Sequence, residues 1–103
     1  MTSGQLRDWV TLSDSVDDGS PVEFSPSRVA GAILESPPGS FDEQKNSMSI
    51  WIHFHRQVTT NTRVDWYDHR RQQDRVATVR GFRDVIENGI VWLELFCEEV
   101  RTP

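Results

Sequence analysis

The stretch "RDVIENGIVWLELFCEEV", Arg83 to Val100, decides the fold that this sequence predicts. It places Asn88-Gly89 between two apolar runs, and both residues tolerate the positive φ of a type I′ hairpin turn. The run after the turn alternates, with one face made of Val91, Leu93, Leu95 and Cys97. Such alternation is typical of a β-strand. The stretch therefore predicts a hairpin near the end of the chain.

The same strand pattern recurs upstream, in segments bounded by turn-forming residues. These segments are 5–13, 27–36, 47–56, 62–70, 75–82 and 83–88. Between the second and the third lies a loop rich in proline, glycine and polar residues, "PPGSFDEQKN". We expect an all-β fold: a small β-barrel or sandwich of six to seven mostly antiparallel strands, with a long loop between strands 2 and 3. The length fits a single domain over residues 1–103.

Composition narrows the function classes. A net charge of −5 argues against a protein whose main task is to grip nucleic acid through its phosphates. No apolar run reaches the roughly 18 residues that a membrane-spanning helix needs, and the first ten residues lack the layout of a signal peptide. We therefore expect a soluble protein made in a cytoplasm. Cys97 is the only cysteine, and its acidic neighbours favour a packed thiol over a reactive one.

Large apolar residues fall on both faces of the later strands. A small barrel has one interior, so a second apolar face needs another partner. Scattered surface aromatics are the simpler explanation, but tryptophan and phenylalanine are enriched at interfaces between proteins. We favour a subunit interface, and the residues expected there are Trp51, His53, His55, Trp66, Trp92 and Phe96.

The motif His53-x-His55 raises the question of a metal site. On a strand both side chains point to the same face, but a catalytic zinc needs a third protein ligand, for which only an unproven contact with Asp68 or His69 is available. We therefore prefer interface contacts for the two histidines. No hydrolase, phosphate-binding or dinucleotide motif occurs, and the basic cluster 69–75 is interpreted as a solvated hairpin tip. The sequence predicts no enzyme, no cofactor and no metal.

Three regions, within about residues 4–14 and 27–101, carry a resemblance to a known family. The opening "GQLRDWVTL" is similar to the start of the head-closure, or head–tail joining, proteins of long-tailed bacteriophages. The segment "RVAGAILES" resembles the place where members have a strand followed by a proline and a loop, and residues 63–100 resemble the end of that family. The matching residues are Gly4, Leu6, Arg7, Val10, Thr11, Leu12, Arg63, Val64, Trp66, Val79, Gly81, Asp84, Leu93, Leu95, Cys97, Glu98 and Val100.

The resemblance implies a β-barrel subunit of a ring of twelve or six copies in the virion neck. Such a stopper binds the adaptor and portal connector, seals the DNA exit channel after packaging, and offers a docking face to a tail-completion or tail-tube protein. It touches phage DNA without sequence-specific binding, meets no membrane, and is assembled in the bacterial host cytoplasm. The resemblance also implies a channel or gating loop formed by Pro37, Pro38, Gly39, Ser40, Phe41, Asp42, Glu43, Gln44, Lys45 and Asn46.

Three alternatives stay open. The first is a tail-completion or other connector protein of the same neck. The second is a small β-barrel enzyme that holds a metal between His53 and His55. The third is a monomeric nucleic-acid binder, although the expected basic groove with interleaved aromatics is missing apart from residues 65–75.

Overall fold

Six antiparallel strands close into a barrel in the order β1-β2-β3-β6-β5-β4. The structure is a computed structural model, and it describes residues 3–14, 24–35 and 46–100. The strands are β1 Asp8–Asp14, β2 Arg28–Glu35, β3 Ser47–His53, β4 Thr62–Asp68, β5 Gln73–Glu87 and β6 Ile90–Glu99, and a short 3₁₀ turn, Ser3–Gln5, precedes β1. The all-β prediction is confirmed, and the closed barrel replaces the sandwich alternative.

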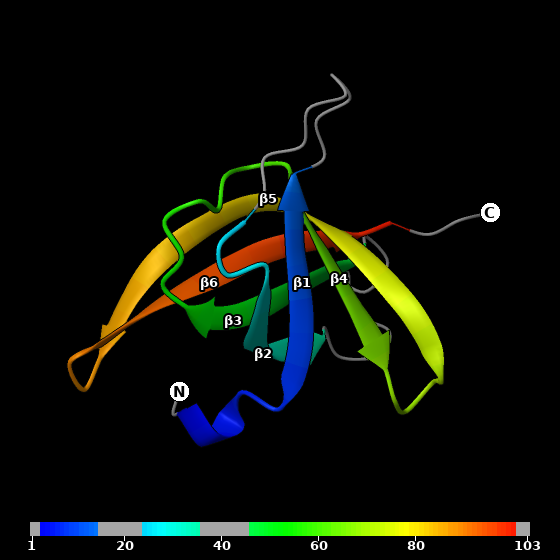
Figure 1. Cartoon of the computed structure of the whole chain (residues 1–103), viewed down its shortest axis with the longest axis horizontal. Coiled ribbons are helices and arrows are strands. Elements are labelled where there is room, and N and C mark those ends of the chain that lie inside the picture. The colour runs from blue at the N-terminus through cyan, green and yellow to red at the C-terminus, as the bar shows by residue number, and fades with distance from the viewer. Residues whose placement is uncertain (1–2, 15–23, 36–45, 101–103) are drawn as a thin grey trace.

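The barrel consists of two three-stranded meanders, β1-β2-β3 and β4-β5-β6, which join at the β1/β4 and β3/β6 edges. Because six strands form the ring, β1 and β6 lie three positions apart and therefore on opposite walls. Figure 1 shows β1 crossing in front while β5 and β6 pass behind it. Residues that point outward from β1 and residues that point outward from β6 therefore lie on different sides of the barrel, which the sequence alone does not show.

The predicted hairpin is formed by β5 and β6 and extends past the end of the barrel (Figure 1). Asn88 and Gly89 have φ of 51° and 77°, as a type I′ turn demands, so the turn prediction is confirmed. The segments 75–82 and 83–88, predicted as separate strands, form one strand, β5, with a bulge between Val79 and Gly81. Beyond the barrel the β5–β6 hairpin continues as a projecting arm, visible at the left of Figure 1.

The core is built from the inward parity of each strand, as the alternation predicts. Its most deeply buried members include Val10, Leu12, Ile50, Ile52, Val64, Val79, Leu93 and Leu95. Cys97 is also buried there, and burial raises the pKa of its thiol to about 12. The prediction that Cys97 packs as a small hydrophobic residue is confirmed.

The connection between β2 and β3 begins after Glu35 and ends before Ser47, at the place predicted for the long loop. Residues 36–45 lie outside the described residues, so of the predicted channel loop only Asn46 is described. In the part of the chain that the structure describes, no helix has the length and apolar character to span a membrane.

Candidate interaction surfaces

The two histidines of the H-x-H motif lie on different sides of the chain. Strand β3 ends at His53, which is exposed, and the chain then turns so that Phe54 is exposed and His55 is buried. The prediction that His53 and His55 share a face is therefore wrong, because it carried the strand alternation past the end of the strand. No metal can bridge two side chains that point to opposite sides.

His55 belongs to one end of the barrel core and is 6% exposed. Its Nε2 lies 2.8 Å from the Pro26 carbonyl oxygen, and its Nδ1 accepts a hydrogen bond from the Gln57 amide at 3.2 Å. Its ring packs 5.4 Å from that of Phe24. These contacts tie residues 24–27 to the segment after β3, which is a structural role inside the subunit.

Two tryptophans of the predicted interface are also buried within the chain. Trp66 is 5% exposed because it lies on the inward parity of β4, and Trp92 is 0% exposed although it lies on the outward parity of β6. The His53 ring stacks on Trp92 with centroids 4.5 Å apart. His55, Trp66 and Trp92 therefore offer no surface to a neighbour, whereas His53 and Phe96 are exposed and Trp51 is half-buried.

The arm carries an exposed apolar surface that the sequence prediction missed. Phe82, Ile86 and Val91 are all exposed, and the register puts them on one face, because Ile86 pairs with Val91 and Phe82 with Leu95. Phe54 joins them, since its amide donates to the Val91 carbonyl at 3.1 Å. We call Phe54, Phe82, Ile86 and Val91 the arm face. In the sequence, Phe82 and Ile86 fall in two predicted strand segments, 75–82 and 83–88, and no local pattern shows that they share an exposed face.

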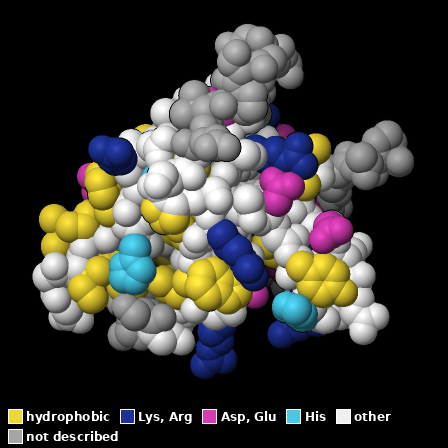
Figure 2. Space-filling view, in the orientation of Figure 1, with side chains coloured by type: hydrophobic (Ala, Val, Ile, Leu, Met, Phe, Trp, Pro, Cys, Tyr) yellow, Lys and Arg dark blue, Asp and Glu magenta, His cyan; other side chains and the backbone are white. Residues whose placement is uncertain are grey.

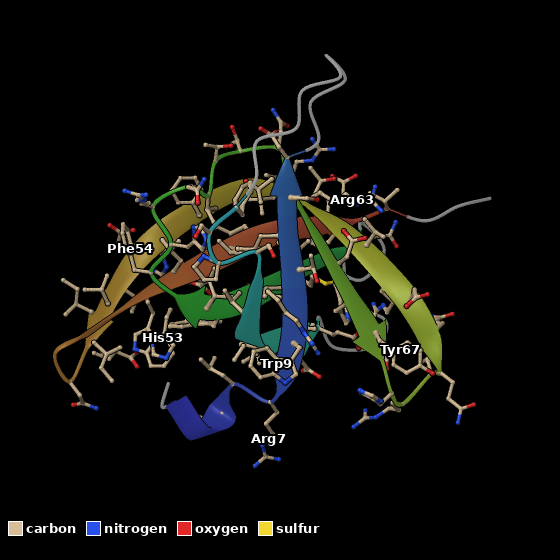
Figure 3. The ribbon with its side chains drawn as sticks, viewed as in Figure 1. Arg7, Trp9, His53, Phe54, Arg63 and Tyr67 are labelled. Atoms are coloured by element: carbon tan, nitrogen blue, oxygen red, sulfur yellow. The ribbon has the colours of Figure 1, made fainter. Side chains whose placement is uncertain are left out.

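A second exposed surface lies on β1 and β4. Trp9 is 59% exposed, and Tyr67 is exposed at the matching end of β4. The Arg28 guanidinium lies 5.1 Å from the centre of the Trp9 ring, and His69 meets the Tyr67 ring edge-on at 4.9 Å. We call Trp9 and Tyr67, with Arg7 and Arg28, the β1/β4 face; Figure 3 shows Trp9, Tyr67 and Arg7 on the same side of the molecule.

One end of the barrel is closed by a cluster of ion pairs around Arg75. This residue is 8% exposed and stacks over Trp66 at 5.2 Å. Its guanidinium donates to Glu99 at 2.7 and 2.6 Å, to Asp68 at 3.0 Å, and also to Glu35. The pKa of Arg75 is raised, above all by the hydrogen bonds to Glu99. No local spacing in the sequence reveals this cluster, because Glu35 and Arg75 lie 40 positions apart.

The same cluster holds both ends of the connection between β2 and β3. Glu35, the last residue of β2, also accepts hydrogen bonds from Arg71 at 2.9 and 3.3 Å, and these bonds lower its pKa. At the other end the Glu99 amide donates to the Asn46 carbonyl at 2.8 Å. Arg75 therefore fixes the two points from which the predicted channel loop departs.

A groove of about 460 Å³ lies beside this cluster, between the end of β2 and the β4–β5 turn. It is lined by apolar Ile33, Leu34 and Trp66 together with charged residues of the turn. Arg71 and Arg75 already bind carboxylates, and Arg70 is exposed. The turn therefore has little free positive charge. The prediction of a solvated tip agrees with the exposure of residues 69–74 but is wrong for Arg75, which is buried by its ion pairs. Within the described ranges no three His, Cys, Asp or Glu side chains gather as a metal site would require.

Comparisons of the chain with protein-family models, with curated proteins and with solved structures found no match.

Proposed function

We propose that the chain is a structural subunit of a bacteriophage neck: a ring-forming head-closure protein that binds the portal–adaptor connector, seals the DNA exit channel and presents a docking face to the tail. One observation carries the proposal. The molecule exposes two apolar surfaces, the arm face on the β5–β6 hairpin with Phe54, and the β1/β4 face. Large exposed apolar surfaces usually mark contacts with other proteins.

A subunit of a cyclic ring needs two different contact surfaces, because each copy touches one neighbour on each side. Two different exposed surfaces meet this need, whereas a dimer about a twofold axis would use a single one. Of the residues first expected at the interface, His53, Phe96 and Trp51 retain exposure for such contacts.

The charge of the chain supports a place beside DNA. At −5 per copy, a ring would repel the phosphate backbone, so that DNA can pass without sticking. The segment 37–46 would enter the channel and close it sterically, from an anchor that Arg75 holds at Glu35 and next to Asn46. Such closure needs no catalytic group, in keeping with a non-enzymatic protein that requires no cofactor.

The partners in this proposal are further copies of the chain, the adaptor or portal connector on one side, and a tail-completion or tail-tube protein on the other. Phage DNA would be contacted without sequence preference. The protein would be assembled in the host cytoplasm and function in the virion neck.

Deletion of the gene from its phage tests the assignment. We expect DNA-filled heads that lose their DNA and carry no tails, and electron microscopy with measurement of released DNA reads out both effects. Heads that keep their DNA but cannot accept a tail would indicate the tail-completion alternative. Sealed heads that join tails normally would overturn the proposal.

A further inference from the structure

We propose that the arm face of one copy of this chain packs on the β1/β4 face of the next copy, so that copies join head to tail. The inference rests on the proposed function, because it names the two surfaces that would build the ring. It assigns the occupant of each exposed face to a second copy of the same chain.

The arm face is exposed in the described part of the subunit, most of all at Ile86. Ile86, near the tip of the arm, is 72% exposed. It lies on the same face of the hairpin as Phe82 and Leu95, and nearer the barrel this face points into the core. Among the described strands, none continues past the end of the barrel to cover this side. Apolar side chains that form the core inside the barrel thus continue outside it as an open surface.

The β1/β4 face carries large exposed aromatic side chains that suit contact with the apolar arm face. Trp9 and Tyr67 are flat amphipathic rings, which are enriched at the centres of protein interfaces. Trp9 projects from β1, which lies across the barrel from β6, and Tyr67 projects from β4, which pairs with β5. In Figure 2 hydrophobic side chains gather on the arm at the left, and a second group lies at the lower centre with basic side chains beside it.

Charge favours this pairing over the association of like faces. Asp84 lies between Phe82 and Ile86 on the arm face, is exposed, and makes no ion pair with a described residue. On the β1/β4 face Arg7 and Arg28 are exposed and likewise make no ion pair with described residues.

Each face also carries a charge of the other sign, Arg56 beside Phe54 and Asp8 beside Trp9. Two arm faces, or two β1/β4 faces, would bring Asp84 against Asp84 or arginine against arginine, whereas the mixed contact pairs them.

The use of two different faces decides the symmetry. A copy that covers its neighbour's β1/β4 face with its own arm face leaves its own β1/β4 face open for a third copy. This heterologous contact propagates and closes into a ring when the rotation between copies allows it. A contact of this kind can be weak in a pair of free subunits and still hold a ring on a connector, because the connector aligns the copies.

Cysteine trapping tests the contact even when it is weak. Two variants of the full chain, Ile86→Cys and Trp9→Cys, are mixed and treated with a short bis-maleimide. Both positions are exposed, and the native Cys97 is buried with a raised pKa, so it does not compete. We expect several-fold more cross-linked dimer from this mixture than from either variant alone. The control mixture replaces Trp9→Cys by Val100→Cys, which is exposed elsewhere on the barrel.

A charge exchange provides a second readout. Asp84→Arg is added to the Ile86→Cys variant, and Arg28→Asp is added to the Trp9→Cys variant. Each charge change alone should reduce the yield of cross-linked dimer several-fold, and the two together should restore it. Yields equal to the Val100 control, or single changes without effect, would overturn the contact and leave the arm face to a different protein. The outcome is separable from the gene deletion above: trapping can fail while the deletion still gives leaking, tailless heads, and trapping can succeed while heads close normally.

Discussion

The Arg75 guanidinium holds the Glu99 carboxylate by two parallel hydrogen bonds, from Nε to Oε2 at 2.7 Å and from Nη2 to Oε1 at 2.6 Å. Paired bonds of this geometry are among the stronger polar contacts in proteins. Through the same guanidinium, β5 is tied to the ends of β2, β4 and β6. The closed end of the barrel and the anchor of the β2–β3 connection are therefore one structural unit.

Replacing Arg75 by methionine should destabilise the fold strongly. The change preserves much of the packing over Trp66 but leaves Glu35, Asp68 and Glu99 facing one another without their shared cation. Breaking a buried ion pair from one side costs about 3–5 kcal/mol in the free energy of unfolding, which urea titration measures.

Arg63→Met is the matched control, because the Arg63–Asp65 pair is exposed and should contribute less than about 1 kcal/mol. Equal losses for the two variants would contradict a special role for Arg75.

The same cluster predicts a loss of stability in acid. Burial alone would raise the pKa of Asp68, but hydrogen bonds from the backbone and side chain of Arg71 and from Arg75 lower it to about 2. An unfolded aspartate titrates near about 3.9, so below that pH the unfolded chain binds the proton more readily than the folded one. Stability should therefore fall as the pH drops from about 4 to about 2.

We expect Asp68 to contribute a loss on the order of 1 kcal/mol, since solvent at the barrel end screens part of the interaction. Thermal unfolding at a series of pH values measures it. Asp68→Asn should be less stable at neutral pH and show a shallower decline between these pH values. A decline identical to that of the parent protein would assign the acid sensitivity to other carboxylates.

The arm depends on its turn. Gly89 has φ of +77°, a conformation that side chains with a Cβ avoid, although no atom lies within 4 Å of where that Cβ would be. Gly89→Ala should therefore cost about 1 kcal/mol through backbone strain alone and speed amide hydrogen exchange near the tip of the arm. In the control Gly4→Ala the space is equally open without a positive φ, and stability should stay within about 0.5 kcal/mol. Equal exchange rates in the arm would refute this.

Local patterns predicted most of the fold, because strands and turns are encoded by neighbouring residues. The alternation in 90–100 and the Asn88-Gly89 turn both appear in the structure as expected. Other features depend on distant parts of the chain. The bulge in β5, which runs unbroken from Gln73 to Glu87, lies between Val79 and Gly81 opposite Cys97 and Phe96 of β6. A period of two residues contains no information on it.

The candidate surfaces were less predictable for the same reason. Alternation separates inward from outward residues but does not say which outward residues another segment covers. Trp92 and Trp9 both lie on outward positions, yet Trp92 is fully buried beneath its neighbours and Trp9 is open. The Arg75 cluster joins residues up to 40 positions apart, so no local motif announces it.

The buried His55 offers a last prediction, which distinguishes a structural role inside the subunit from a role in contacts between copies. His55→Leu removes the contacts with the Pro26 carbonyl and the Gln57 amide and leaves both groups without that partner at a covered barrel end. Unsatisfied buried polar groups cost about 1–3 kcal/mol, so we expect a loss of that size in the free energy of unfolding.

The same substitution at the exposed His69 should change stability by less than about 0.5 kcal/mol, and it serves as the control. If His55 acted instead as a surface contact between copies, His55→Leu would leave the unfolding of the free subunit unchanged and reduce only the yield of trapped dimer. Unfolding and trapping measured on one preparation therefore distinguish a structural histidine from an interface histidine.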